Sequence, residues 1–424
     1  MTDRLRYSVI CVVTAACAIA TLSAASPSEP PSNWPQFRGA ENAGLADIPA
    51  GDLPTTLAKD DFRWEIKLGG AGYGSPAVWA GKAFVLTCDE RTGLRQAVCV
   101  SVEDGKVLWR KDYRFGVVRH HRDNSLAAST PALDANRVVV CWASAKEVTV
   151  HALDHDGNEK WRRSLGGYST KHGPCVTPII HEGTVYVAND NMGPSVLAAI
   201  NADDGEVKWK TDRPSGKAAY GTPLIYRPGG GKKPQLVVSS TGGGIAAYDP
   251  DSGKPLWAAA DANPLRVVAS PVQAGDAVVS SSGTGGRGKW IIAVRPPKAP
   301  GGQAQTAWKL EEDAHYVPTP VAVGDKLFTV HDSGLIACYQ SSTGKQLWKS
   351  QLEGRFYGSP VCAGGRIYVL SRTGILYCYA AAGKFELLGK TDLGEPSFAT
   401  PAFAGRKMLL RTHTRLICVE KKRD

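Results

Sequence analysis

The sequence predicts an all-β fold: an eight-bladed β-propeller of four-stranded antiparallel blades, with the ring closed by an N-terminal strand around Trp64. Three observations predict it. The 424 residues include 46 Gly and 27 Pro, and no stretch beyond the N-terminus has the pattern of a long amphipathic helix. A Ser-Pro or Thr-Pro dipeptide recurs eight times. The same order of apolar runs and turns follows each dipeptide, which is typical of a repeat architecture.

The dipeptide marks the first strand of each copy. Successive prolines are separated by 55, 47, 45, 48, 49, 40 and 41 residues, so each copy is long enough for four short strands. The eight prolines are Pro76, Pro131, Pro178, Pro223, Pro271, Pro320, Pro360 and Pro401.

A second and a third strand follow in each copy, as in "EGTVYVAN" and "LAAINADDG" of the third copy. A turn Gly and, four residues later, a Trp mark the fourth strand. In the fifth copy Trp308 lies further from Gly302, and in the seventh Leu387 takes the Trp position. Five copies keep the offset: Gly105/Trp109, Gly157/Trp161, Gly205/Trp209, Gly253/Trp257 and Gly344/Trp348.

These Trp residues are predicted to be structural. A single four-stranded sheet cannot cover both of its faces, and radial stacking buries the faces of neighbouring blades against one another. We expect a Trp to fill the space between each blade and its neighbour, contributing about 2–3 kcal/mol by area burial. The set comprises Trp64, Trp109, Trp161, Trp209, Trp257, Trp308 and Trp348.

The last copy is incomplete, and this predicts how the ring closes. It ends in "TRLICVEKKRD" without the Gly and Trp of a fourth strand. A spare strand, "FRWEIKLGG", precedes the first dipeptide and contains Trp64. We expect it to pair with the strand around Leu416–Val419, which leaves the ring without a free edge.

The N-terminus predicts export. Arg4 and Arg6 precede an apolar run that ends in small residues, so residues 1–25 are predicted to be a signal peptide; a retained membrane anchor or lipid attachment at Cys17 are the alternatives. Residues 26–60 then form an N-terminal extension and residues 61–424 the propeller. Without residues 1–25 the chain keeps 48 Lys and Arg against 39 Asp and Glu, a net charge of +9.

Eight cysteines remain after cleavage, and no CxxC motif occurs. In the third strand, several cysteines hold the position that Ala holds in other copies, and two more end second strands. We expect these six to be buried free thiols, since Cys is among the most buried residue types. They are Cys88, Cys99, Cys141, Cys338, Cys378 and Cys418; Cys175 and Cys362 are left open.

Strand alternation predicts two different ends of the ring. The turns between strands one and two and between strands three and four are tight and acidic, whereas the other connections are longer and basic. Long loops on a rigid scaffold commonly carry binding residues. The predicted long loops are 110–128, 162–174, 189–196, 210–219, 258–268, 281–289 and 309–317.

Basic and aromatic residues at this long-loop end are the candidate binding residues. They predict an anionic ligand or partner; a solvated basic surface, and packing for the aromatic residues, are the alternatives. The candidates are Arg119, His120, His121, Arg122, His172, Arg213, Arg266, Arg287, Tyr316, His331 and Tyr357. Tyr73, Tyr220 and Phe398 are also expected near the mouth of the channel.

The repeat unit, as in "AYDPDSGKPLW", resembles the PQQ-type propeller repeat over about residues 60–419. That group includes BamB-type propellers, which are assembly scaffolds, and quinoprotein alcohol dehydrogenases. The stretch "NWPQFRGAENAGL" resembles the start of exported bacterial PQQ-like proteins of unassigned activity. The resemblance implies the fold, which by itself does not fix the function.

For a quinoprotein, the resemblance implies a metal held by Glu, Asn and Asp, an Asp base, and adjacent cysteines forming a disulfide. This sequence has no Cys-Cys pair, and "NDN" at 189–191 lacks an obvious Glu partner. We therefore expect no catalytic residues, no metal site and no cofactor, with PQQ and calcium as the alternative.

The sequence thus predicts an exported, monomeric, non-catalytic binding or scaffold module of the periplasm or cell envelope. Its expected partner is a protein or an anionic envelope component, with no nucleic acid and no membrane span after signal cleavage. The alternatives are a PQQ-dependent oxidoreductase and an outer-membrane assembly factor of the BamB type.

Overall fold

The computed structural model describes Met1 and residues 33–214, 216–299 and 302–422. The chain divides into two compact units, Met1–Pro30 and Pro31–Asp424, and the second is described below. Apart from Met1, the predicted signal peptide lies outside the described residues. Within the described residues, no helix has both the length and the apolar character needed to cross a membrane.

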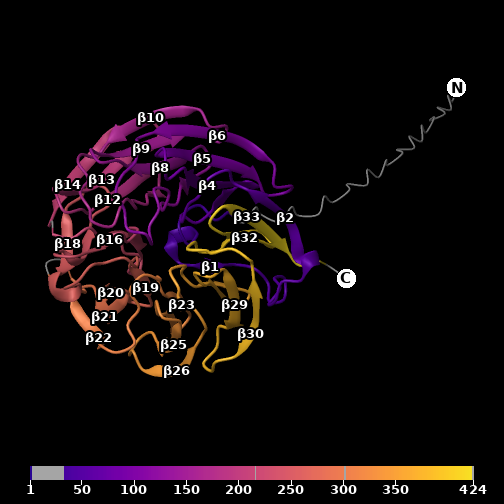
Figure 1. Cartoon of the computed structure of the whole chain (residues 1–424). Helices are drawn as coiled ribbons and strands as arrows, with labels where there is room; N and C mark the ends of the chain where they lie inside the picture. The colour runs from indigo at the N-terminus through magenta and orange to yellow at the C-terminus, as the bar shows by residue number, and fades with distance from the viewer. Residues whose placement is uncertain (2–32, 215, 300–301, 423–424) are drawn as a thin grey trace. The chain divides into compact units, whose positions relative to one another are not determined.

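Eight blades of four antiparallel strands form a ring, which confirms the predicted propeller (Figure 1). Residues of all eight blades line a hollow at its centre, which is called the channel. Blade one contains β3 (Ala77–Trp79), β4 (Lys82–Cys88), β5 (Leu94–Ser101) and β6 (Val107–Arg114), and blade two contains β7 (Ala132–Leu133), β8 (Val138–Ala143), β9 (Val148–Leu153) and β10 (Glu159–Ser164). Blade three contains β11 (Ile179–His181), β12 (Thr184–Asn189), β13 (Ser195–Asn201) and β14 (Val207–Arg213), and blade four contains β15 (Leu224–Tyr226), β16 (Gln235–Ser240), β17 (Gly244–Tyr248) and β18 (Pro255–Ala259).

Blade five contains β19 (Val272–Ala274), β20 (Ala277–Thr284), β21 (Arg287–Arg295) and β22 (Gln305–Leu310), and blade six contains β23 (Val321–Val323), β24 (Lys326–Val330), β25 (Leu335–Gln340) and β26 (Gln346–Gln351). Blade seven contains β27 (Val361–Ala363), β28 (Arg366–Leu370), β29 (Ile375–Ala380) and β30 (Leu387–Asp392), and blade eight contains β31 (Ala402–Ala404), β32 (Lys407–Arg411), β33 (Arg415–Glu420) and β2 (Phe62–Lys67). Among the described residues there are three short 3₁₀ turns: η1 (Ala40–Asn42) precedes the first strand, η2 (Lys59–Asp61) precedes β2, and η3 (Ala260–Ala262) follows β18.

The ring closes as predicted. Strand β2 pairs antiparallel with β33 and becomes the outermost strand of blade eight, with Trp64 opposite Cys418. The N-terminal strand of the ring therefore completes the last blade. Figure 1 shows indigo β2 beside yellow β33.

The Gly and Trp of each copy contact different neighbours. The indole of Trp64 in blade eight lies over Gly105 of blade one, where an added Cβ would come 2.7 Å from the ring. The indole N–H also donates to the Val102 carbonyl of blade one at 2.9 Å. Trp64 thus interlocks with the next blade, as predicted for a residue between blades, whereas the Trp257 indole donates to Gln235 of its own blade. The contact of indole and Gly also joins Trp109 to Gly157, Trp161 to Gly205, Trp209 to Gly253 and Trp308 to Gly344.

The junction between blades seven and eight lacks this interlock. Leu387 replaces the Trp, and the N-terminal chain packs there instead. The Tyr368 hydroxyl donates to the Pro54 carbonyl at 3.2 Å, and the Leu57 N–H donates to the Thr391 hydroxyl at 2.8 Å. The extension therefore covers a junction where the repeat lacks its Trp.

An earlier part of the extension crosses the tight-turn end of the channel. Trp34 exchanges backbone hydrogen bonds with Val78 of blade one, at 2.9 and 2.8 Å. The buried Arg38 side chain donates to the Pro320 carbonyl of blade six at 2.6 Å. The Asn42 amide donates to the Pro223 carbonyl of blade four, at 2.5 Å. Strand β1 (Leu45–Ala46) then pairs parallel with β27 of blade seven. Residues 34–46 therefore form a floor tied to several blades.

The cysteines of the propeller are free thiols. The six expected to be buried are buried, and burial raises their pKa values, to about 12 for Cys99. Of the two left open, Cys362 is buried and Cys175 is half-buried. Cys99 lies opposite Trp109 in the sheet, which explains the need for a small residue in the third strand.

One predicted long loop is wrong. At residues 281–289 strands β20 and β21 continue towards each other, with Thr284 opposite Arg287, and only Gly285 and Gly286 join them. The irregular fifth copy thus has long hairpin strands where a loop was expected.

Candidate functional site

A ring of hydroxyl groups lines the centre of the propeller. In each blade the Ser or Thr precedes the marker proline, and at six blade junctions its hydroxyl accepts a hydrogen bond from the backbone N–H of the corresponding residue in the previous blade, at 2.9–3.1 Å. The sequence showed the dipeptide but not this role. The residues are Ser75, Thr130, Thr177, Thr222, Ser270, Thr319, Ser359 and Thr400.

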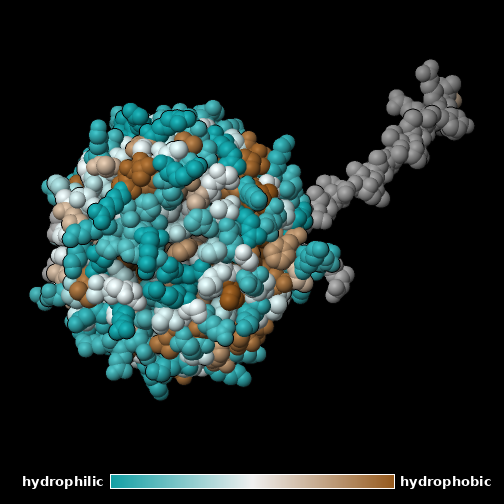
Figure 2. Space-filling view, in the orientation of Figure 1, coloured by the Kyte–Doolittle hydropathy of each residue, from teal (hydrophilic) through white to brown (hydrophobic). Residues whose placement is uncertain are grey.

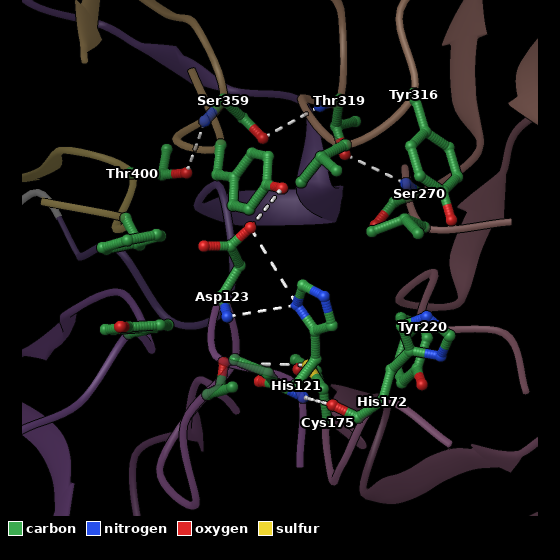
Figure 3. A pocket seen from close by; sticks show the side chains of 18 of the residues that line it. His121, Asp123, His172, Cys175, Tyr220, Ser270, Tyr316, Thr319, Ser359 and Thr400 are labelled. Carbon is green, nitrogen blue, oxygen red and sulfur yellow. Dashed lines mark hydrogen bonds and ion pairs between the residues drawn. The ribbon is translucent and has the colours of Figure 1, made fainter. Parts of the chain in front are cut away.

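A cavity of about 510 Å³ lies at the long-loop end of the channel, and all eight residues of the hydroxyl ring line it. Figure 3 labels Ser270, Thr319, Ser359 and Thr400 of this ring. Phe37 of the floor also lines the cavity. The cavity therefore depends on the N-terminal extension as well as on the blades. Its size suits a small molecule or one group of a larger ligand.

One wall of the cavity is aromatic. Tyr73 and Phe398 stack with ring centroids 3.9 Å apart, and Tyr357 meets Phe398 edge-on at 5.8 Å. The Arg372 guanidinium lies 4.6 Å from the Tyr357 ring centroid and 4.9 Å from that of Phe398. This arrangement holds a cation against two aromatic rings from blades seven and eight.

An acidic side chain reaches this wall from the loop between β6 and β7. Asp123 forms an ion pair with Arg372 and accepts a hydrogen bond from the Tyr357 hydroxyl at 3.3 Å. Its backbone N–H donates to His121 Nδ1 at 3.2 Å, which fixes that ring (Figure 3). The loop thus lies across part of the mouth of the cavity.

The opposite wall is basic. Arg266 Nη1 lies 3.3 Å from His172 Nε2 and 3.4 Å from the Tyr316 hydroxyl. Partial burial, together with the charge of Arg266, lowers the pKa of His172. Because a guanidinium can only donate, His172 Nε2 is the acceptor in this contact. Arg266 Nε is buried and has no partner among the described residues.

The cavity carries excess positive charge. Arg122 and Arg355 also line it, and neither is in an ion pair within the described part of the chain. Asp123 is the one carboxylate among the lining residues, and Arg372 already neutralises it. An anion entering the cavity would therefore find Arg122, Arg266 and Arg355 without ionic partners.

The structure brings some of the predicted site residues together. His121, Arg122, His172, Arg266, Tyr316 and Tyr357 all line the cavity, and so do Tyr73, Tyr220 and Phe398. Sequence reasoning missed three residues that line the cavity, Phe37, Asp123 and Arg355. It also missed Arg372, which pairs with Asp123 beside the cavity.

Other predicted site residues lie outside the cavity. His120 contacts Glu90 at 3.2 Å, and His331 Nδ1 lies 2.7 Å from the Ser333 hydroxyl. Arg119 and Arg287 are exposed, and Arg287 begins β21.

Arg213 is a structural residue of blade three. Its guanidinium is buried and binds both carboxylate oxygens of Asp190, at 2.7 and 3.0 Å, and donates to the Tyr248 hydroxyl at 2.9 Å. The "NDN" segment 189–191 thus supplies an ion-pair partner, and Arg213 presents no free charge to a ligand.

The fold and the site define a closed β-propeller with a basic, aromatic-walled cavity at one end of its channel. The chain belongs to the family whose model is described as "Outer membrane protein assembly factor BamB", which matches residues 94–298 and 287–413. No curated protein matches the sequence.

Solved structures of low sequence identity share the fold. BamB from Moraxella catarrhalis is 14% identical, with a TM-score of 0.59 over 85% of this chain and 97% of that one. Quinohemoprotein alcohol dehydrogenase from Comamonas testosteroni is 12% identical, with a TM-score of 0.64 over 92% and 81%. The computationally designed Ika8 protein is 12% identical, with a TM-score of 0.60 over 84% and 98%. Such likeness establishes the architecture alone.

The cavity does not fit a metal-bound quinone of the kind that the repeat implies. The Asp123 carboxylate is paired with Arg372, and the Asn124 side chain is hydrogen-bonded to the His172 carbonyl and the Ser125 N–H. Across the described ranges, no group of three His, Cys, Asp or Glu residues could hold a metal ion.

Proposed function

We propose that this protein is an exported, non-catalytic binding module of the cell envelope. The long-loop end of its channel holds an anionic ligand or an acidic group of a protein partner. The observation that carries the proposal is the cavity with Arg122, Arg266 and Arg355 unpaired, because burying an anion there supplies the missing opposite charge. The basic N-terminus and apolar run of residues 1–25 support export.

The surface supports a polar mode of binding. Hydrophilic residues cover most of the face seen in Figure 2. Several exposed large apolar side chains, including Leu108, Leu256 and Leu347, belong to outermost strands of different blades. Isolated apolar residues of this kind do not need a partner to cover them.

A second candidate function is outer-membrane assembly, in the manner of the BamB-type proteins. The family match favours it, since the model covers most of the propeller. It requires attachment to the membrane and a protein partner. Fractionation, combined with the mass of the mature N-terminus, tests the attachment.

Two triple variants with equal loss of charge test the main proposal. Arg122→Gln, Arg266→Gln and Arg355→Gln remove the unpaired charges of the cavity. Arg91→Gln, Arg119→Gln and Arg287→Gln remove three exposed charges outside it.

We expect the cavity variant to lose at least about 10-fold in affinity for anionic polymers, corresponding to about 1.4 kcal/mol, while the control stays within about twofold of the unsubstituted protein. Adsorption measured as a function of salt gives both values. Equal losses in the two variants would show a general basic surface, and unchanged adsorption in the cavity variant would refute the proposal.

A further inference from the structure

Arg372, Tyr357 and Phe398 form a preorganised cationic site on one side of the cavity. Arg372 follows β28, Tyr357 precedes β27, and Phe398 precedes β31, so the site belongs to blades seven and eight. The guanidinium lies within 5 Å of both ring centroids, and its side chain is only 19% exposed. A cation with so little water around it binds an anion more strongly than an exposed arginine does.

The anion now in this site comes from elsewhere in the ring. Asp123 lies 249 positions from Arg372 in the sequence, on the loop between blades one and two. That loop is anchored near blade three, because the His121 N–H and the Asn124 amide both donate to the His172 carbonyl, at 3.1 and 2.9 Å. The loop that places the Asp123 carboxylate beside Arg372 is thus hydrogen-bonded to His172, near blade three.

The contacts match the geometry of a carboxylate. One oxygen of Asp123 accepts from Arg372 Nη2 and the other accepts from the Tyr357 hydroxyl. His121 Nδ1 lies 3.9 Å from the second oxygen and already accepts the Asp123 N–H. Arg372 and Tyr357 thus each serve one of the two oxygens of the carboxylate.

We infer that Arg372 and Tyr357 form the carboxylate subsite of the cavity, and that Asp123 is a resident carboxylate which the ligand replaces. The inference rests on the proposed binding function and narrows its ligand to a compound, or an acidic side chain, that bears a carboxylate. The remainder of that ligand lies over the cavity towards Arg266, beside the ring of hydroxyl groups. Displacement of Asp123 releases the loop from blades seven and eight.

Formate is the probe that tests this subsite, because it is a carboxylate with no further groups. In Asp123→Ala the resident carboxylate is gone and Arg372 is left unpaired, so we expect formate to bind at least about 10-fold more tightly than to the unsubstituted protein. In Asp123→Ala combined with Arg372→Gln this gain is lost. Chemical-shift titration of the backbone amide of Tyr357, a residue left unchanged in all three proteins, measures each formate affinity.

Inorganic phosphate is the second arm of the experiment. Phosphate binding to Asp123→Ala more tightly than formate would overturn the carboxylate assignment, as would equal formate affinities with and without Asp123. Asp123→Asn, which keeps an oxygen acceptor for Tyr357, gives a second variant if the alanine variant is poorly folded; we expect it to bind formate more tightly than the unsubstituted protein, and no gain would overturn the inference. Loss of polymer binding in the Arg122, Arg266 and Arg355 variant tests the proposed function separately, since the arginine that pairs with Asp123 is Arg372, which that variant keeps.

Discussion

The interlock between Trp64 and Gly105 gives a prediction whose size follows from two glycines with the same backbone geometry. Gly105 and Gly81 both have φ of +75°, but a Cβ at Gly105 would lie 2.7 Å from the Trp64 ring, whereas nothing lies within 4 Å at Gly81. Gly81→Ala should therefore cost only the left-handed backbone, about 1–2 kcal/mol. Gly105→Ala adds overpacking against the indole, about 1–3 kcal/mol more.

A double substitution separates the two costs. In a Trp64→Ala background the indole is gone, so Gly105→Ala should cost no more than Gly81→Ala does. Urea unfolding followed by tryptophan fluorescence and circular dichroism gives the free energies of unfolding for all variants. Equal costs for Gly105→Ala and Gly81→Ala in the otherwise unsubstituted protein would refute the interlock as the reason for the Gly-x-x-x-Trp repeat.

Three further predictions concern buried charge, the floor and the cofactor. Burial raises the pKa of Asp332 from 3.8 to about 6, so protonation of this carboxyl stabilises the folded state. The free energy of unfolding should therefore fall by about 2–3 kcal/mol as pH rises from 4 to 6. Asp332→Asn should flatten that slope, as measured by urea unfolding at each pH. Arg38→Met leaves the Pro320 and Asn42 carbonyls without their donor and should cost about 2–4 kcal/mol, with faster proteolysis of the N-terminal segment; an unchanged cleavage rate would contradict the floor. Adding PQQ with calcium should give neither a bound-quinone spectrum nor dye reduction, whereas a saturable spectrum would support the oxidoreductase alternative.

Sequence reasoning predicted what the repeat imposes. Eight copies fix the number of blades, and the missing fourth strand of the last copy predicted the position of Trp64. The small residue at Cys99 followed in the same way, because each position could be compared with its equivalents in other copies. These predictions depend on the repeat alone, and the structure agrees with them.

Features outside the repeat had no such internal comparison. The course of residues 34–46 across the channel depends on contacts of Arg38 and Asn42 with distant blades. This segment occurs once in the chain, so no equivalent residues in other copies indicate its contacts. The pairing of Asp123 with Arg372 depends on the path of one long loop. Because 249 positions separate the two residues in the sequence, no local sequence pattern predicts this ion pair.

Arg213 is different, because the sequence did hold a usable signal. Asp190 follows β12 and Arg213 ends β14, so both lie at the same end of blade three. Opposite charges at one end of one small sheet predict an ion pair. Treating all basic residues of the long-loop end as one surface overlooked this pairing.

The location of bound anions tests the account most directly. Iodide is an anion whose anomalous scattering identifies its position in crystals of the protein, whatever the natural ligand is. We predict iodide in the cavity beside Arg122, Arg266 and Arg355, at higher occupancy than at any exposed arginine. Iodide distributed over exposed residues such as Arg91 and Arg119, with none in the cavity, would contradict the account.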